Sequence, residues 1–597
     1  MDRQVAMDLN PLSTSPAADA TVAAAPTPHR WDRLATPILF VLGAVLMHSI
    51  YAGTNGWLRP IVGVPGNDSF YHVKMAAMIP QVGLLREFPW LQFCYFTDQG
   101  QSFISHHYGF HILLIPFVHL SHWLTGDYLP GGRWAICTFF GLMLVLLDRL
   151  LIAARMPWRW LWLPLFVLLP FQFFTRHAFI RAIAPSLVLM MLILLLMFRR
   201  RPVWTALAVA AYVHLYMGGV IFGPLLVGTY VFAIVISSQD RLAALRLALW
   251  GAAGWTVGVL AHPYRDGMWG FLKLQVFGTG LSPDIPVGQE WKPYNDLWWF
   301  AQMSGVVLGV WAAAVVMRLR AGKPANAEEL ALLLMNVVFF VLTLKARRFI
   351  EYWPMFCLLS AAYLASPVMG GGAERIQKRN GAVDRSRAAV LEPIAAAGMV
   401  LVIVGFSPVW EEIQRTSRCE YDLTAIRAAM EFLGEHSQPG DVVFTDDWDI
   451  FPVYFYYNSH NHYIVGLDPK FTHARRPDLW ERYVKITRGQ IPSDVHVETR
   501  SADDNTVMQT LHVTLEDIRD RFGAGYVITD RDHRPLATKL AAVTDFAELV
   551  YPPSSYAKSR DAPYLIFRIG TDVEHGHSGR ATVPATIAGV PRTVPRL

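Results

Sequence analysis

Long apolar runs recur along the first 406 residues of the chain. A helix needs about 20 mostly apolar residues to cross the hydrocarbon core of a bilayer. About eleven runs approach that length, at residues 36–53, 131–153, 158–174, 182–198, 203–217, 219–236, 246–261, 298–317, 328–344, 353–368 and 390–406. The pattern therefore predicts a mostly α-helical protein, built as a polytopic transmembrane helix bundle.

A further apolar run, residues 109–124, is interrupted by Pro116 and His119. We expect an outer-surface or re-entrant helix here, because this choice places the arginine-rich short loops inside, as the positive-inside tendency requires. Those loops contain Arg155, Arg159, Arg199, Arg200, Arg201, Arg241, Arg246, Arg318, Arg320, Lys323 and the basic residues from 375 to 387. Residues 54–130, 262–297 and the chain beyond 407 are then predicted to lie outside.

The pattern changes after residue 407. Residues 410–570 alternate between short apolar runs typical of strands and amphipathic stretches typical of helices. Strands are predicted at residues 442–445, 463–466, 526–529 and 564–569, and helices at 424–436 and 515–522. This alternation predicts a C-terminal extracytoplasmic α/β domain.

These patterns divide the chain into four parts. Residues 1–33 are rich in Ala, Pro, Ser and Thr and predict a disordered tail. Residues 34–407 form the predicted transmembrane domain, in which the first apolar run is an uncleaved signal anchor because many apolar segments follow it. Residues 408–572 form the extracytoplasmic domain, and residues 573–597 are predicted to be a second disordered tail.

The composition agrees with a membrane protein and excludes a nucleic-acid binder. Of the 597 residues, 53% are hydrophobic and 17% are charged, whereas soluble proteins carry roughly 25% charged residues. The net charge of +5 is small for this length, so no nucleic-acid partner is expected. The four cysteines show no metal-ligand spacing such as C-x-x-C.

Three short constellations on the predicted outer face can carry chemistry. The first is residues 66–72, where Asp68 lies beside aromatic residues. A carboxylate at the membrane surface can act as a general base or a metal ligand. It can also be only the N-cap of a helix, and both readings stay open.

The second constellation is residues 286–293, where Glu290 is an isolated acid before the membrane re-entry at Trp298. An interfacial loop in a tryptophan belt is the alternative. The third contains Arg347 and Arg348 at the outer end of a span. Cations outside run against the positive-inside tendency, so we expect an anion such as a lipid-linked phosphate, or else lipid headgroups, to recruit them.

Histidines close the first outer loop. His107 and His111 are four residues apart, a spacing that allows a shared metal on a helix. Because no acidic third ligand lies nearby in sequence, a contact with the acceptor or an interfacial role is favoured over a metal site for His107.

Together these motifs resemble those of the oligosaccharyltransferase catalytic subunit and the wider GT-C glycosyltransferase superfamily. Residues 68–72 look like the family's first-loop acidic motif, and 289–293 are similar to its Ser-x-Ser-Glu or Thr-Ile-x-Glu motif. Residues 347–352 look like its Arg-Phe-x-Tyr-Tyr stretch, whose arginine meets the donor diphosphate. Trp448 and Asp449 partly resemble the acceptor-binding Trp-Trp-Asp-Tyr-Gly motif. The resemblance covers residues 36–450.

One departure from the family bears on the metal. The family's second outer loop has an Asp-x-Asp or Asp-x-Glu motif that helps bind a divalent ion, whereas residues 175–181 here contain no acid. Arg176 or Arg181 is then expected to neutralise the leaving phosphate. Mg²⁺ or Mn²⁺, held by Asp68 and Glu290, is slightly less favoured than metal-independent catalysis.

The resemblance implies an inverting GT-C glycosyltransferase in the inner (plasma) membrane. It would move a sugar or oligosaccharide from a polyprenyl-phosphate or polyprenyl-diphosphate donor to a protein, lipid or glycan acceptor at the outer face. The implied roles are catalysis by Asp68 and Glu290, donor-phosphate binding by Arg347, Arg348, Arg176 and Arg181, and acceptor binding by Trp448, Asp449 and His107.

Two other classes of protein fit parts of the sequence. A lipid-phosphate flippase or transporter would need charged or broken helices at mid-membrane, and the spans show few buried charges. A non-catalytic GT-C-like assembly factor is favoured by the missing second-loop acid.

Overall fold

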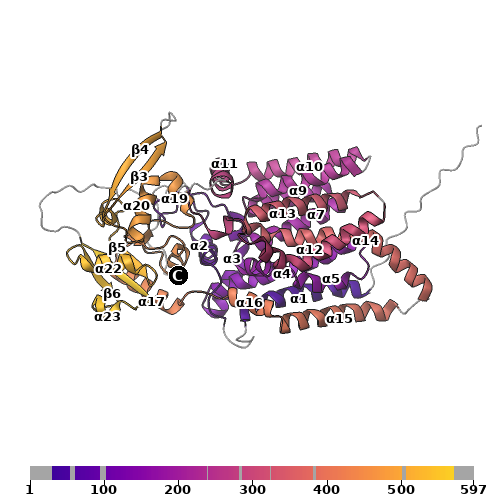
Figure 1. Cartoon of the computed structure of the whole chain (residues 1–597), viewed down its shortest axis with the longest axis horizontal. Helices are drawn as coiled ribbons and strands as arrows, with labels where there is room; N and C mark the ends of the chain where they lie inside the picture. The colour runs from indigo at the N-terminus through magenta and orange to yellow at the C-terminus, as the bar shows by residue number, and fades with distance from the viewer. Residues whose placement is uncertain are drawn as a thin grey trace, which may run out of the picture.

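The computed structural model describes residues 30–53, 61–94, 103–237, 240–281, 285–322, 324–380, 385–500 and 506–570. A bundle of long helices and a C-terminal domain containing strands lie end to end (Figure 1). The tails predicted at residues 1–33 and 573–597 fall outside the described residues, apart from residues 30–33, which begin the first helix.

Seven helices among the described residues are long and apolar enough to cross a membrane. They are α1 (Arg30–Ala52), α4 (Leu129–Ala153), α9 (Gly219–Ser237), α10 (Arg241–Leu260), α12 (Leu297–Arg320), α13 (Ala327–Lys345) and α14 (Trp353–Asn380). Two bent pairs raise the number to nine if each is one span, namely α6 (Phe171–Ala178) with α7 (Ile183–Phe198), and α15 (Arg385–Phe406) with α16 (Pro408–Thr416). The chain is therefore an integral membrane protein.

The predicted count of eleven spans is not confirmed, since the described residues give seven to nine candidates. Residues 158–174 form only η3 (Arg159–Leu161), α5 (Trp162–Val167) and the start of α6, because prolines at 157, 164 and 170 each remove a backbone donor. Residues 203–217 form α8 (Pro202–Leu215), whose 14 residues extend about 21 Å, less than a bilayer core of about 30 Å. Residues 109–124 form α3 (Tyr108–Thr125), which is not among the candidate spans.

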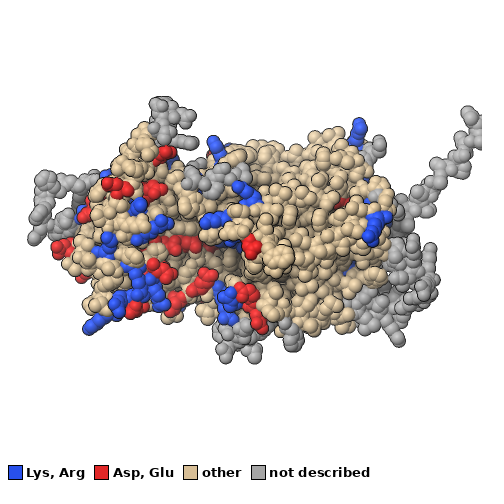
Figure 2. Space-filling view, viewed as in Figure 1, with Lys and Arg blue, Asp and Glu red and all other residues tan. Residues whose placement is uncertain are grey.

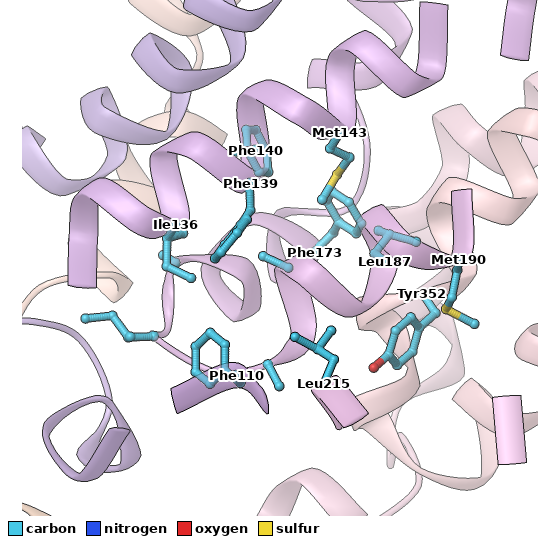
Figure 3. Packing of buried hydrophobic residues seen from close by; sticks show 14 of the residues in the cluster. Phe110, Ile136, Phe139, Phe140, Met143, Phe173, Leu187, Met190, Leu215 and Tyr352 are labelled. Carbon is cyan, nitrogen blue, oxygen red and sulfur yellow. The ribbon is translucent and has the colours of Figure 1, made fainter. Parts of the chain in front are cut away.

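The bundle buries one set of apolar side chains and exposes another. Phe110, Phe140 and Phe173 pack together with other large side chains in its interior (Figure 3). Leu207 and Leu249 are among many large apolar residues that are exposed on its helices. Figure 2 shows almost no charged side chain along the side of the bundle, whereas the C-terminal domain is rich in them. An apolar belt of this size is suited to contact with lipid.

The C-terminal domain is built on a five-stranded sheet with the order β2-β1-β5-β7-β6. β1 lies parallel to β2 and β5, and β7 is antiparallel to β5 and β6. The strands predicted at 442–445, 526–529 and 564–569 are present in it, whereas the one predicted at 463–466 is found only as the short β2, which ends at Tyr463. The strands are β1 (Val442–Thr445), β2 (His462–Tyr463), β5 (Tyr526–Asp530), β6 (Ala547–Tyr551) and β7 (Tyr564–Ile569), with a separate hairpin of β3 (Ser493–Arg500) and β4 (Thr506–Val513).

Helices cover both faces of the sheet. Successive residues of β1 enter different cores, Val443 on one face and Phe444 on the other, as the alternation of side chains in a strand requires. The predicted helix at 424–436 is α17, and the one at 515–522 is the shorter α21. The helices of this domain are α17 (Leu423–His436), α18 (Phe451–Tyr457), α19 (Pro469–Arg475), α20 (Pro477–Thr487), α21 (Asp517–Asp520), α22 (Arg534–Ala542) and α23 (Tyr556–Ser559).

The loop that follows α2 (Asn67–Val82) joins the bundle to this sheet. Leu91 pairs in parallel with Tyr463 of β2. The Tyr463 N–H donates to the carbonyl of Trp90 at 2.9 Å, and the Phe93 N–H donates to the carbonyl of Ile464 at 2.9 Å. These backbone bonds extend the edge of the sheet and hold the C-terminal domain over the end of the bundle where α2 begins.

Candidate active site

A cavity of about 100 Å³ lies where the bundle meets the C-terminal domain. Its walls come from the start of α2, the loop before α3, the turn between α6 and α7, the segments η5 (Gln289–Trp291) and η6 (Arg347–Glu351), and the residues that precede α19. Five of the site residues predicted from sequence line it, namely Asp68, His107, Arg181, Glu290 and Arg348.

Asp68 lies in the first turn of α2 but does not cap it. The helix follows Gly66, whose φ of 71° favours glycine, and no side chain caps this helix end. A Cβ at Gly66 would lie 3.3 Å from the ring of Phe179. The carboxylate of Asp68 instead forms an ion pair with Arg181 at 2.8 Å. The N-cap interpretation of Asp68 is therefore wrong.

Glu290 in η5 gathers three arginines. Its Oε2 lies 2.6 Å from Arg176 and 3.2 Å from Arg181, and its Oε1 lies 3.3 Å from Arg348. Burial by itself would raise the pKa of Glu290, but Arg176, Arg348 and Arg181 hold that pKa well below its ordinary value. Glu290 is thus a fixed negative charge that positions guanidinium groups, and it is a poor proton acceptor.

The guanidinium of Arg181 lies between the two predicted catalytic acids. Its Nη2 contacts Asp68 and its Nη1 contacts Glu290. Arg181 stands in the turn where the chain bends by 112° between α6 and α7, and this break in the helix lets it reach the cavity. In this arrangement Asp68 and Glu290 do not fit a shared divalent ion, because a cationic side chain already occupies the place between them.

The other three predicted phosphate ligands differ in position. Arg348 lines the cavity and lies over Trp291, with its Cζ 4.1 Å from the ring centroid. Arg176 stands behind Glu290 and donates from Nε to the buried Glu351 at 2.6 Å. Arg347 donates to a backbone carbonyl at 3.0 Å. Neither Arg176 nor Arg347 lines the cavity.

Three histidines, His72, His106 and His107, line the cavity, and His111 lies behind them against His72. His72 Nδ1 lies 2.8 Å from His111 Nε2, and the ring centroids of His72 and His107 are 4.7 Å apart. Burial, and then the neighbouring His106, His72 and His111, hold the pKa of His107 well below its ordinary value, and the pKa of His106 is lowered to about 3. These rings are neutral at pH 7 and can form uncharged hydrogen bonds. The sequence analysis placed His72 in the 68–72 motif but gave it no role, although its spacing of four from Asp68 on a helix was a signal.

Asp468 also lines the cavity and was not predicted. It follows Leu467, a non-glycine residue with φ of 71°, and its Oδ1 caps α19 by accepting the Lys470 N–H at 2.8 Å. Burial raises the pKa of Asp468 to about 7, and the negative charges of Glu290 and Asp68 add to the shift. Its place in the loop that follows β2, five residues beyond the end of that strand and at the carboxyl edge of a parallel pair, was the available sequence signal.

Trp448 and Asp449 lie outside the cavity. Trp448 is half-buried and packs against the apolar core on one face of the sheet. Asp449 is exposed, and its backbone carbonyl accepts a hydrogen bond of 2.9 Å from Asn67. The loop after β1 therefore touches the residue before Asp68 without entering the cavity.

A second group of ionisable residues lies within the C-terminal domain. Among the described residues, Asp446, Asp530 and His533 form the one metal-compatible group of three, with their ligand atoms within 4.8 Å of one another. His533 Nδ1 lies 2.9 Å from Asp530 and 3.3 Å from Asp446. Burial would lower the pKa of His533, but hydrogen bonds to the two carboxylates raise it to about 10. The group is therefore an imidazolium held between two acids.

No family model matches the sequence, and a comparison with curated proteins finds no significant match. Solved structures do match. The archaeal oligosaccharyltransferase AglB from Archaeoglobus fulgidus, in complex with an inhibitory peptide and a dolichol-phosphate, is similar with a TM-score of 0.58 at 12% identity, over 85% of this chain and 70% of that chain. The complex of the same protein with Zn and sulfate gives a TM-score of 0.53 at 12% identity, over 85% and 69%.

A bacterial structure matches as well. The arabinofuranosyltransferase AftD from Mycobacteria gives a TM-score of 0.51 at 15% identity, over 90% of this chain and 42% of that chain. These proteins are GT-C glycosyltransferases. At such low identity the likeness shows a common fold.

Proposed function

We propose that this chain, which has the fold of the GT-C glycosyltransferases, transfers a sugar or oligosaccharide from a polyprenyl-linked phosphate donor to an acceptor at the membrane surface. The convergence of Arg181 and Arg348 with Asp68 and Glu290 in one cavity carries the proposal. Guanidinium groups bind phosphate oxygens bidentately, and a cavity at the end of an apolar bundle suits a donor whose lipid stays in the membrane.

The arginines act on the leaving group. In an inverting transfer the acceptor oxygen attacks the sugar C1 from the face opposite the phosphate, and the C1–O bond breaks with its electron pair going to the phosphate oxygen. Negative charge develops on that oxygen, where positioned cations have their largest effect. Arg181 and Arg348 supply the charge, and Asp68 and Glu290 hold both guanidinium groups in place. Arg176 supports Glu290 from behind, and Arg347 receives the donor at the rim.

We also propose that catalysis is independent of Mg²⁺ and Mn²⁺. Arg181 supports this choice, because its guanidinium lies between the two carboxylates that would share the ion. A divalent cation in that place would be repelled by the arginine. The positive charge that a metal would supply comes from the side chains of the protein.

The acceptor side is assigned to the loop before α3 and to the C-terminal domain. Of the predicted contacts, His107 lines the cavity and offers a neutral ring. Trp448 and Asp449 are placed to contact the more distant part of a larger acceptor, because their loop touches Asn67. Protein, lipid and glycan acceptors are all compatible with such a surface.

Release of the lipid product tests the proposed function. Purified protein given polyprenyl-phosphate and polyprenyl-diphosphate sugars should release polyprenyl phosphate or diphosphate, measured by chromatography of the lipids. Asp68→Asn should lower the rate by about 10²-fold. The variant removes a charged partner of Arg181, and a displacement of the guanidinium group by about 1 Å is enough to cause a loss of this size. Asp478→Asn, which alters an Arg476 ion pair of 3.0 Å outside the cavity, is the matched control. A wild-type protein that releases no lipid product from any of these donors contradicts the proposal.

We also propose that the protein lies in the inner (plasma) membrane and that its C-terminal domain is on the extracytoplasmic side. An impermeant thiol reagent should then label Gln509→Cys in β4 of intact cells and leave Ala321→Cys, after α12, unlabelled, although both positions are exposed. A Cys419→Ser background removes the half-buried thiol, and the other three cysteines are buried. Labelling of Ala321→Cys in sealed cells would overturn this orientation.

A further inference from the structure

We infer that Asp468 is the general base of the reaction, and that the acceptor it deprotonates is a hydroxyl group. Its role rests on the proposed function, which supplies the donor. It goes beyond that function by assigning a catalytic residue to the C-terminal domain and by naming the chemical class of the acceptor. The inference is drawn from three carboxylates that line one cavity, those of Asp68, Glu290 and Asp468.

Ion pairing divides these three carboxylates into two kinds. Asp68 is bound to Arg181, and Glu290 is bound to three arginines. Over the described part of the chain, no Lys or Arg side chain forms an ion pair with Asp468. A guanidinium group paired with a carboxylate oxygen occupies the place that an acceptor hydroxyl would need, and the arginines also hold the pKa of Glu290 well below its ordinary value, so that Glu290 accepts a proton poorly. Asp468 is the carboxylate of the cavity that is available to accept one.

The backbone holds Asp468 in place on the side of the C-terminal domain. β2 is tied to the loop after α2 through Tyr463, and the left-handed conformation of Leu467 turns the chain from β2 towards α19. Figure 1 shows α19 on the side of this domain that faces the bundle. One carboxylate oxygen of Asp468 accepts the Lys470 N–H, which leaves the other oxygen for a ligand. Arg181 and Arg348 belong to the bundle, so leaving group and acceptor are served from different parts of the protein.

The acidity of Asp468 suits this task. A general base works best when its pKa lies near the operating pH. Burial brings the pKa of Asp468 to about 7, whereas the arginines hold that of Glu290 well below its ordinary value. Two carboxylates whose environments push their pKa values apart are suited to different roles in one reaction.

The proton and electrons of the step balance without a cofactor. A lone pair of the acceptor hydroxyl oxygen forms the new bond to the sugar C1, and the C1–O bond to phosphate breaks. The electron pair of that bond goes to the phosphate oxygen beside Arg181 and Arg348, and the hydroxyl proton goes to Asp468. Asp468 then returns the proton to water. An acceptor that is already anionic needs no base, and the carboxylates of the cavity would repel it.

Asp468→Asn should lower transfer by on the order of 10² to 10⁴ in rate, measured with polyprenyl-phosphate hexoses as donors and octyl glucoside as the hydroxyl acceptor. The melting temperature and the binding of polyprenyl phosphate should stay unchanged, because Asn caps a helix as well as Asp does. The wild-type kcat/KM should fall about tenfold per pH unit below pH 7 and level off above it, and the variant should lose this dependence. Asp422→Asn is the matched control, since Asp422 caps α17 on the exposed surface.

Chemical modification can detect the protonated carboxyl group of Asp468 without an activity assay. Dicyclohexylcarbodiimide converts protonated carboxyl groups to N-acylureas. Mass spectrometry should find the adduct on Asp468 at pH 6, about thirtyfold less of it at pH 8.5 because the pKa is about 7, and none on Glu290. Labelling of Asp468 that does not change with pH would overturn the inference.

The activity outcomes separate two failures. If Asp468→Asn keeps the wild-type rate and pH dependence, the inference is overturned and the proposed function still stands. The same holds if the pH dependence is lost in Asp68→Asn and not in Asp468→Asn. A wild-type protein that releases no lipid product overturns both.

Discussion

Arg181→Ala is expected to lower the rate of transfer by on the order of 10² to 10³-fold, the effect of removing one positioned group that stabilises a developing oxyanion. Arg181 lines the cavity and bridges Asp68 and Glu290. Its loss removes positive charge at the leaving phosphate and leaves Asp68 without its partner. The measurement is kcat for the release of polyprenyl phosphate by detergent-solubilised protein.

Arg347→Ala is the control variant for Arg181→Ala. Arg347 belongs to the same predicted motif as Arg348 but donates to a backbone carbonyl and does not line the cavity, so we expect a loss of less than about tenfold. EDTA should leave the wild-type rate unchanged. Equal losses in both variants, or a wild-type rate that EDTA abolishes and Mn²⁺ restores, would show that the arginine assignment is mistaken.

The helix bundle could be predicted from the apolar pattern, but the number of spans could not. Seven of the predicted runs coincide with helices long enough to cross a membrane. The run at 158–174 does not form the predicted span. Hydropathy measures the side chains and does not detect the loss of backbone donors at the prolines of positions 157, 164 and 170. In the C-terminal domain, the buried β1, β5 and β7 read as apolar runs, whereas the half-exposed β6 does not.

The candidate site was predicted in part, because each motif is local whereas the cavity is not. Asp68, Glu290 and Arg348 stood out as charges in unusual places, and the family resemblance grouped them. The contact of Arg181 with both acids depends on the bend between α6 and α7, which no periodicity signals. Asp468 was missed because its position depends on the pairing of Leu91 with Tyr463, two segments far apart in sequence.

His533→Ala should destabilise the C-terminal domain by about 3 kcal/mol, the lower end of the range for breaking a buried ion pair. The side chain of Asp446 is fully buried, and that of His533 is 25% exposed, so removal of the imidazolium leaves a buried carboxylate without a counter-charge. Burial already raises the pKa of Asp446 to about 6. Urea denaturation of the full chain in detergent, followed by tryptophan fluorescence, would measure the loss.

His512→Ala is the matched control, because His512 pairs with Asp494 on the exposed hairpin, and a change within about 0.5 kcal/mol is expected there. The pH dependence adds a second check. The pKa of His533 is about 10 in the folded protein, above its ordinary value of 6.5. Its contribution to stability is therefore fully present below pH 6.5 and is lost as the pH rises through 10. The difference between wild type and His533→Ala should shrink from pH 7 to pH 10, and a difference that grows over this interval would show that the charge on His533 is not what stabilises the domain.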